Sequence, residues 1–485
     1  MSLDTLDAVL PPAIGVFPHL CLTGRYVLSQ RENDAPGHSD EYAGHGLKAV
    51  ALPDGRVAAA VADAGSRGAA AAIATARLLA VLRGHLESGA SLDAAVAAVD
   101  RYAERSPFSS GATMAAVILS PGDGSVEVAS AGHALPLHLS SGGGSHPLAL
   151  GPSRPLGLGG TASRGTLTLA CGDAVMLHTD GLVTAQNGSV LDGALALREV
   201  IAGLGLGGAT GPAFGDALCE GVLAAMQRPH GYRDDVALLV VQRVPNPQPL
   251  KVSSVAAGAP STQAVALFAA WLDGFGVSLL DHVSLSGATA EMIGVLSLMS
   301  SVTVSAELTD DAQVEVTLEV DRRWQPESDL QRRALVVAGG LVTSLTLRHR
   351  DQTTQVILRQ PVGRTVPLLQ SGSADRRTGV AVARRPPSEP MRADEITGGV
   401  RLSGSLGPDE EAVFHDLVHE TTCAGTRSAV VDLTRVDRLC GPAVRLLFQY
   451  AERTRACDAN LTVVAARGSA ADQVLTRAAL PHRWE

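Results

Sequence analysis

The sequence predicts a multidomain protein of the α/β and α+β classes, and three observations lead to this prediction. The chain has 485 residues, which is too long for one hydrophobic core and corresponds to about three domains. Strand-like apolar runs alternate with segments whose apolar residues have helical spacing. Two stretches rich in proline and polar residues interrupt this pattern. We therefore expect domains at 1–245, 258–362 and 393–485, joined by linkers at 246–257 and 363–392.

The first domain is predicted to combine buried strands with helices. Five apolar runs have the length and composition of strands: VAAAVADA, ATMAAVILS, SVEVASAG, AVMLHTDG and VALLVVQRV. Two further segments carry apolar residues at helical spacing: GAAAAIATARLLAVLRGHL and SLDAAVAAVDRYAER. The segment VPNPQPLKV, with three prolines, breaks all periodicity and marks the end of the domain.

The second and third domains have different element orders. The second begins with the predicted helices STQAVALFAAWLDGF and LLDHVSLSGATAEMIGVLSLM. Strands SVTVSAEL and VEVTLEV, a helix-poor stretch, and strands TSLTLRHR and QVILRQ follow, which suits a helix pair on an antiparallel or mixed sheet. Residues 361–391 are rich in Pro, Ser and Arg and are predicted to be a mobile tether. From residue 393 strands and helices alternate, which predicts a small sheet with helices against it.

Composition and charge exclude several classes of protein. Hydrophobic residues are 46% and charged residues 18%, as in globular proteins, and we expect no membrane-spanning segment. The net charge of −10 argues against binding to nucleic acid or to anionic lipid. The N-terminal sequence does not have the pattern of a secretory signal, so we expect a cytoplasmic location. The six cysteines form no C-x-x-C pair, which suits reduced, buried thiols rather than a zinc site.

Three acidic segments point to a metal site: VADAGSRG, LHTDGLVTA and RDDVALLVV. Each places an aspartate at the end of a strand-like run, so Asp63, Asp180 and Asp234 are expected to meet at one edge of a sheet. Carboxylates without His or Cys partners favour Mg²⁺ or Mn²⁺, and such ions suit phosphate-ester hydrolysis. Taken singly, each aspartate is better explained as a turn or helix-cap residue. The three together, each close to a Gly or another Asp, favour the metal site.

With these segments in place, residues 6–244 resemble the PPM (PP2C-like) serine/threonine phosphatase domain of the SpoIIE/RsbU type. The landmarks occur in order: LDAVLPP as the entry helix, ALPDGR as the first hairpin, VADAGSRG, ATMAAVILS, SAGHALPL, GPSRPLGLG, GDAVMLHTDGLVTA and RDDVALLVV. The resemblance implies a β-sandwich flanked by helices. It also implies that Asp63 and the carbonyl of Ala64 hold one ion, and that Asp180 and Asp234 hold the other, with Asp235 supporting them.

The chain departs from that family at a second acidic motif. Where the family has G-G-D-W-Y-D, this sequence reads AGHGLK, so His45 and Lys48 replace both carboxylates. A weaker or single-metal site is therefore compatible with the sequence. His45 is expected to be a surface-loop residue after the polar insert RENDAPGHSDE, with ion binding as the alternative. His133, in SAGH, matches the family pattern, and we assign it no role in proton transfer.

Residues 258–362 resemble the ATP-binding fold of anti-sigma-factor serine kinases (GHKL type). The resemblance places Thr289 and Ile293 where the family has its Glu and its metal-binding Asn, and QRRAL where its phosphate-binding glycines lie. We therefore expect no ATP binding and interpret this domain as a pseudokinase used for docking.

Residues 393–485 resemble a STAS (anti-anti-sigma-factor) domain, most clearly in VVDLTRVDRLCGPAVRLL. The family carries a phosphorylatable serine in a D-S-S-G turn. Here the turn begins at Cys440 and contains no serine, so phosphorylation at that place is excluded.

Two functional hypotheses follow from these resemblances. The first is a Mn²⁺- or Mg²⁺-dependent phosphatase, with one or two ions, that removes phosphate from a phosphoserine on a STAS-type anti-anti-sigma protein in a partner-switching pathway controlling a sigma factor. The second is a weak or inactive pseudophosphatase scaffold that binds anti-sigma and anti-anti-sigma proteins. The retained aspartates favour the enzyme. The sequence leaves the oligomeric state open, and a dimer is compatible with it.

Overall fold

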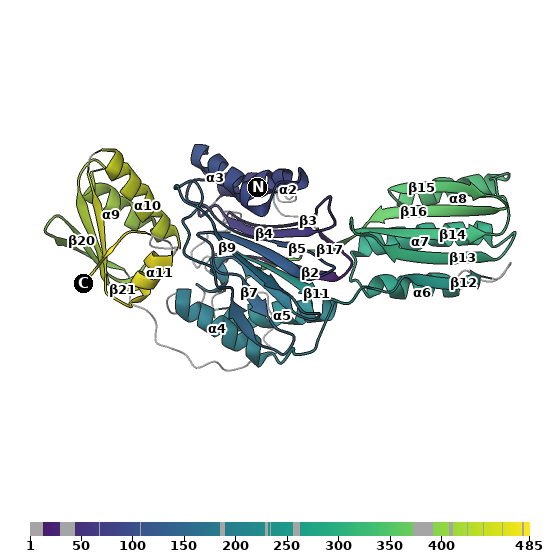
Figure 1. Ribbon diagram of the computed structural model, residues 1–485, viewed down its shortest axis with the longest axis horizontal. Helices are drawn as coiled ribbons and strands as arrows, with labels where there is room; N and C mark the ends of the chain where they lie inside the picture. Colours follow the sequence, from purple (N-terminus) through teal and green to yellow (C-terminus); the bar gives the residue numbers. More distant parts are fainter. Residues whose placement is uncertain are drawn as a thin grey trace.

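The computed structural model describes most of the chain in three bodies arranged in a row (Figure 1). The described residues are 13–29, 44–66, 68–106, 108–184, 190–227, 231–232, 234–255, 262–371, 391–406, 411–423, 425–439, 441–457, 459–477 and 480–485. The first domain lies in the centre, the second at one end and the third at the other. The predicted entry helix at 6–12 and Cys440 lie outside the described residues.

The first domain is a sandwich of two β-sheets. The six-stranded sheet has the order β18 (Leu368–Gln370), β2 (Leu20–Leu28), β11 (Val236–Arg243), β10 (Ala174–His178), β7 (Leu137–Leu139) and β8 (Ser145–Pro147). The five-stranded sheet has the order β3 (His45–Ala51), β4 (Val57–Asp63), β5 (Thr113–Leu119), β6 (Ser125–Ala131) and β9 (Ser163–Thr168). All five strands predicted from the sequence are present, and ALPDGR forms the turn between β3 and β4.

Helices cover the outer faces of both sheets. Helices α2 (Ala69–Glu87) and α3 (Leu92–Arg105) pack on the five-stranded sheet, and α4 (Val190–Gly203) and α5 (Pro212–Met226) pack on the other. Strand β4 is buried on both sides: Val57, Ala59 and Val61 face the opposite sheet, while its intervening alanines face α2 and α3. This alternation explains why β4 reads as a continuous apolar run, and it directs Asp63, the next odd-numbered residue, to the inner side.

Part of the predicted linker at 363–392 belongs to the first domain. Strand β17 (Gly363–Thr365) pairs with β1 (Ala13–Gly15), and β18 pairs in parallel with β2 at the edge of the six-stranded sheet. Arg364 fixes this segment, because its guanidinium donates to Thr23 Oγ1 at 2.7 Å and to the carboxylate of Asp216. The prediction of a tether from 363 is therefore wrong for residues 363–371, since edge strands need only short stretches of backbone pairing.

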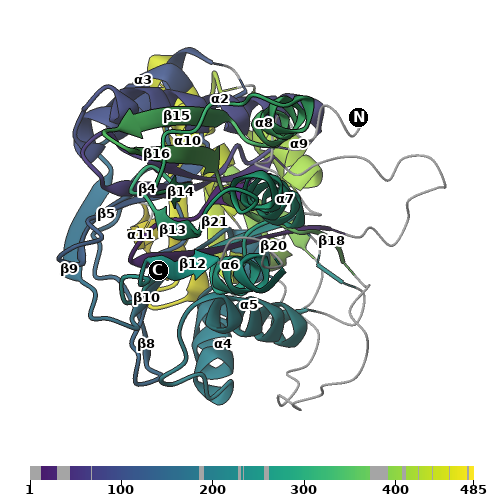
Figure 2. The ribbon, with the colours of Figure 1, turned by 90° about the vertical axis from the view of Figure 1, so that its right-hand side faces the viewer.

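The second domain is a five-stranded antiparallel sheet covered by helices. The strand order is β12 (Leu250–Val255), β13 (Val302–Leu308), β14 (Gln313–Val320), β16 (Thr353–Pro361) and β15 (Ser344–Arg350). The helices are α6 (Thr262–Asp273), α7 (Leu279–Leu296) and α8 (Asp329–Leu341). In Figure 2 the three helices lie together on one side of this sheet.

Two predictions about the second domain are corrected. The linker expected at 246–257 contains β12, which pairs with β13. The stretch expected to be helix-poor contains α8, which begins with a capping box between Ser328 and Gln331. Thr289 and Ile293 of α7, the residues at the expected nucleotide positions, are fully buried in the core of this domain.

The third domain has the predicted alternation of strands and helices. Its sheet has the order β19 (Arg392–Ile396), β20 (Gly399–Leu406), β21 (Ala429–Leu439), β22 (Leu461–Ala465) and β23 (Arg483–Trp484). Its helices are α9 (Glu411–Thr421), α10 (Gly441–Ala456) and α11 (Ala470–Arg477). It contacts the first domain, because Leu158 joins its core and the Arg154 guanidinium lies over the Phe448 ring.

Helix α2 bears on the expectation that no segment crosses a membrane. By length and composition alone it could do so, although 44% of its most apolar window is buried within the protein. Its leucines Leu78, Leu82 and Leu86 pack against the five-stranded sheet. Apolar helices with such a buried face are common in protein cores, so this composition is weak support for a membrane span.

Candidate metal centre

The predicted acidic residues meet at one end of the sandwich. Strand β4 ends at Asp63, and antiparallel pairing places His45, the first residue of β3, directly opposite it. Strand β10 ends just before Asp180, and Asp234 precedes β11, its antiparallel neighbour in the other sheet. The two sheets therefore bring His45 and three aspartates to the same edge, although these residues span almost 190 positions in the chain.

His45 is a buried residue of this site, and the expectation of a surface loop is wrong. Only 2% of its surface is exposed. Its Nε2 lies 3.6 Å from Asp63 Oδ1 and 3.7 Å from Asp234 Oδ1. Its Nδ1 lies 2.9 Å from Thr179 Oγ1, which also accepts the N–H of Ala237. The imidazole is thus held between strands of both sheets.

The surrounding charges determine the protonation of His45. Burial opposes the charged form and is the largest influence, but the carboxylates of Asp63, Asp234, Asp180 and Asp235 together outweigh it. The pKa of His45 is therefore raised above its ordinary value. In the absence of another cation, this site stabilises positive charge.

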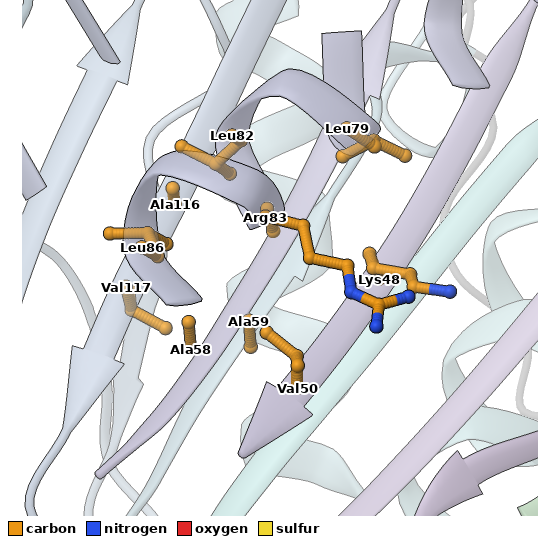
Figure 3. A pocket seen from close by; sticks show the side chains of 11 residues that line it. Lys48, Val50, Ala58, Ala59, Leu79, Leu82, Arg83, Leu86, Ala116 and Val117 are labelled. Atoms are coloured by element: carbon orange, nitrogen blue, oxygen red, sulfur yellow. The ribbon is translucent and has the colours of Figure 1, made fainter. Parts of the chain in front are cut away.

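Lys48 does not belong to the metal centre. It lies three positions after His45 along β3, so its side chain emerges on the opposite face of the strand. There it lies between the sheet and α2, beside Arg83 and close to Leu79 (Figure 3). Burial and the neighbouring Arg83 lower its pKa. Of the two replaced carboxylates, only the position occupied by His45 bears on metal binding.

Three side chains are arranged so that they could hold one metal ion. Ligand atoms of His45, Asp180 and Asp234 all lie within 4.8 Å of one another. Asp63 lies beside this group, because its Oδ1 is 3.6 Å from the Nε2 of His45. The same oxygen accepts the N–H of Gly65 at 2.5 Å. The donor set of carboxylates and one imidazole fits a divalent cation, because it combines negative charge with a nitrogen ligand.

Ala64 lies next to Asp63 as the resemblance requires. Its N–H donates to the carbonyl of Gly44 at 3.1 Å, and its methyl group packs against Ala71 and Ala74 of α2. These contacts fix the backbone that follows Asp63. They are compatible with a carbonyl ligand at this position, whose role remains a prediction.

Asp235 supports the site rather than facing it. Its Oδ2 accepts the hydroxyl of Tyr26 at 2.8 Å, and its Oδ1 accepts the N–H of Ser29 at 2.8 Å. Both carboxylate oxygens therefore have donors from the segment that includes β2. These bonds anchor the backbone that carries Asp234. A metal-ligand role for Asp235 stays a prediction.

His133 lies behind Asp63 and is neutral. Its Nδ1 is 2.7 Å from the hydroxyl of Thr113, which pairs with Asp63 across β4 and β5. Its Nε2 is buried and, among the described residues, has no hydrogen-bond partner of good geometry. Burial lowers the pKa of His133 to about 3. A histidine this difficult to protonate is a poor proton donor near neutral pH.

Sequence reasoning missed three contributors to this site: Tyr26, Thr179 and the inward orientation of His45. Thr179 directly precedes Asp180 and is the first residue of the T-D-G motif, so the motif itself could have identified it. Tyr26 lies on β2, which no acidic motif marks. The inward orientation of His45 depends on the register between β3 and β4.

Comparisons with known proteins concern the family and the fold of this part of the chain. Residues 53–244 match the family model of Stage II sporulation protein E (SpoIIE). The structure of the RsbU and RsbW domains of Rv1364c from Mycobacterium tuberculosis aligns with a TM-score of 0.64 and 24% identity, covering 74% of this chain and 99% of that one. This likeness extends beyond the first domain and establishes the fold.

Two further structures align with lower scores. The PP2C phosphatase domain of SpoIIE from Bacillus subtilis, with a fragment of its regulatory domain, has a TM-score of 0.39 at 18% identity, covering 48% of this chain and 65% of that one. RsbX in complex with magnesium has a TM-score of 0.34 at 15% identity, covering 46% of this chain and 95% of that one. The family-model match over residues 53–244 supports a serine/threonine protein phosphatase in this part of the chain.

Proposed function

We propose that the first domain is a Mn²⁺- or Mg²⁺-dependent phosphatase that removes phosphate from a phosphoserine on a STAS-type protein. The observation that carries this proposal is the convergence of Asp63, Asp180 and Asp234 at one end of the sandwich. These carboxylates come from three distant segments, and His45 lies within 4 Å of two of them. A phosphatase of this class needs such a negatively charged cradle for its cation.

The residues have distinct parts in this proposal. Asp180 and Asp234 hold the ion directly, and Asp63 with the carbonyl of Ala64 completes the cradle. Asp235 keeps Asp234 in place through its bonds to Tyr26 and Ser29. When bound, a divalent ion supplies positive charge that polarises a phosphate ester and lowers the pKa of water.

The choice of partners rests on the architecture of the whole chain. The Mycobacterium tuberculosis structure joins an RsbU domain to an RsbW domain, and 74% of this chain follows its fold. The proposal therefore places the protein in a cytoplasmic partner-switching pathway that regulates a sigma factor. The second domain serves as a kinase-like docking module without ATP, and the third as a STAS-like module. A phosphorylated anti-anti-sigma protein and an anti-sigma factor are the expected partners.

One observation favours the alternative of a pseudophosphatase scaffold. His45 occupies the place of a carboxylate, and its raised pKa means that an imidazolium could neutralise Asp63 and Asp234 without a metal. In that case the site would be a structural ion pair, and the chain would act by binding its partners.

Phosphate release from a phosphorylated STAS protein, with Mn²⁺ or Mg²⁺ added, distinguishes these functions. The enzyme hypothesis predicts that Asp63→Asn loses at least 100-fold in rate. The matched control Asp123→Asn, which alters an exposed turn of the same domain, should keep the wild-type rate. Equal background rates for wild type and Asp63→Asn, with no Mn²⁺ binding by calorimetry, would establish the scaffold instead.

A further inference from the structure

We propose that His45 is itself a metal ligand, binding through Nε2 together with Asp180 and Asp234. The result is a single-ion centre of mixed nitrogen and oxygen ligands that prefers Mn²⁺ or another first-row transition metal over Mg²⁺. This inference rests on the proposed function only in requiring that the site bind a cation. It goes further by naming the nitrogen ligand, the number of ions and the metal preference.

The distances around His45 suit an ion shared with its neighbours. Two ligand atoms that are each about 2.1 Å from one ion lie roughly 3.0 to 4.2 Å apart, depending on the coordination geometry. The separations of Nε2 from Asp63 Oδ1 and Asp234 Oδ1 are 3.6 and 3.7 Å, within this interval. Ligand atoms of His45, Asp180 and Asp234 lie within 4.8 Å of one another, so only a small contraction is needed.

The same distances are too long for a direct hydrogen bond. An imidazolium bonded to a carboxylate would bring nitrogen and oxygen to about 2.7–2.9 Å. Nε2 of His45 makes no such bond within the described part of the chain, although the ring is fully buried. A buried polar nitrogen that points at two carboxylates from this distance leaves space for a cation between them.

Thr179 orients the imidazole for this role. When Nδ1–H donates to Thr179 Oγ1, at 2.9 Å, the lone pair of Nε2 is free and directed toward the carboxylates. Metal-binding histidines commonly have such a partner on their second nitrogen, because it fixes the ring and the tautomer. Thr179 is itself fixed by the N–H of Ala237, and it directly precedes Asp180.

The supply of ligands favours one ion. Asp235 has donors on both carboxylate oxygens, and Lys48 lies on the α2 side of the sheet. Among the described residues of the site this leaves three carboxylates and one imidazole. Mg²⁺ prefers an oxygen-only environment, whereas imidazole suits transition metals. Replacing a carboxylate by His45 therefore shifts the preference away from Mg²⁺.

Pulsed electron paramagnetic resonance on the Mn²⁺-loaded full-length chain tests this assignment directly. A bound imidazole couples a ¹⁴N nucleus to the Mn²⁺ electron spin, and this readout does not depend on catalysis. We expect the coupling in wild type and in the control His146→Gln, which alters an exposed histidine of the same domain. We expect no coupling in His45→Asp.

Calorimetry provides the second readout. His45→Asp should retain cation binding and lower the Mn²⁺-over-Mg²⁺ affinity ratio by about 10-fold or more, the usual scale for ligand-sphere changes. If His45→Asp does not fold, His45→Asn serves instead, because its amide can replace Nδ1 but not Nε2. This variant should bind Mn²⁺ about 10- to 100-fold more weakly and show no ¹⁴N coupling.

The outcomes separate this inference from the proposed function. Wild type that binds Mn²⁺ and hydrolyses phosphoserine without ¹⁴N coupling, or an unchanged affinity ratio in His45→Asp, overturns the role of His45 and leaves the phosphatase intact. Wild type that binds no divalent ion overturns both. Wild type that binds Mn²⁺ with ¹⁴N coupling but has no phosphatase activity supports the ligand assignment and removes the enzyme.

Discussion

Gly181, which follows Asp180 in the T-D-G motif, permits a close approach of two backbone segments at the metal centre. A Cβ atom at this position would lie 2.1 Å from the carbonyl oxygen of Asp235 and 3.2 Å from that of Asp234. Because 3.0 Å is the practical minimum, Gly181→Ala must separate these backbones by about 0.9 Å. The neighbouring atoms belong to the main chain, so no side-chain rotation relieves the overlap.

This displacement should damage metal binding more than folding. It moves Asp180 away from Asp234. A displacement of about 1 Å between reacting groups can cost roughly 100-fold in rate, and we expect a loss of similar size when two ligands of one ion are separated. Overpacking of this kind typically costs about 1–3 kcal/mol of stability. We therefore expect Gly181→Ala to lose about 100-fold in Mn²⁺ affinity by calorimetry, with the first domain still folded.

Gly84→Ala is the matched control. Gly84 lies within α2, and a Cβ there meets nothing within 4 Å. Alanine should stabilise this helix by up to about 1 kcal/mol and leave the Mn²⁺ affinity unchanged. An affinity for Gly181→Ala within twofold of wild type would refute the reasoning, because the two backbones would then be free to move apart without consequence.

Other contacts lead to further predictions. Tyr26→Phe removes a hydrogen bond to the buried carboxylate of Asp235, so we expect a loss of about 1.5–3 kcal/mol in urea unfolding; a loss below 0.5 kcal/mol would contradict this contact. His133 is protonated more readily in the unfolded chain, because its folded pKa is about 3 against an ordinary 6.5. Its contribution to stability is therefore complete above about pH 6.5 and lost as the pH falls, by about 1.4 kcal/mol per unit. Pulsed hydrogen exchange of β5 and β6 should show this slope in wild type and a shallower one in His133→Asn. Arg364→Ala removes the donor to Asp216, so amide exchange in β18 should accelerate at least 10-fold while α7 is unaffected; unchanged exchange in β18 would show that strand pairing alone holds the segment.

The way in which each strand is buried determines how much of the fold could be predicted from the sequence. The central strands of the sandwich are covered on both faces, so β4 and β11 appear as continuous apolar runs. The third domain was predictable because its strands and helices alternate with clear composition. The positions of Asp63, Asp180 and Asp234 could be anticipated because each aspartate lies beside such a buried strand.

The remaining features depend on tertiary contacts that local sequence does not record. Strands β17 and β18 are short and lie in a polar stretch, and they form only because β1 and β2 offer free edges. Helix α8 contains two adjacent glycines and several exposed apolar residues, so its periodicity is weak. For His45, the polar flanks suggested a surface loop, whereas pairing with Asp63 places it inside the site.

The first domain is consequently discontinuous in sequence. Residues 363–370 return from the second domain and complete the edges that β1 and β2 present. A fragment cut at the predicted boundary near 245 would lack these strands and the Arg364 contacts. Any change in its activity would reflect an incomplete sheet as well as the loss of the downstream domains.

The most direct test of the metal centre is an anomalous difference map from crystals of the full chain grown with Mn²⁺. The proposed site predicts one peak at the end of the sandwich, within coordination distance of Asp180, Asp234 and the Nε2 of His45. The peak should be absent from crystals of Asp234→Asn. Absence of any peak at this end in wild type would contradict the metal centre itself, and two peaks would contradict a single-ion site.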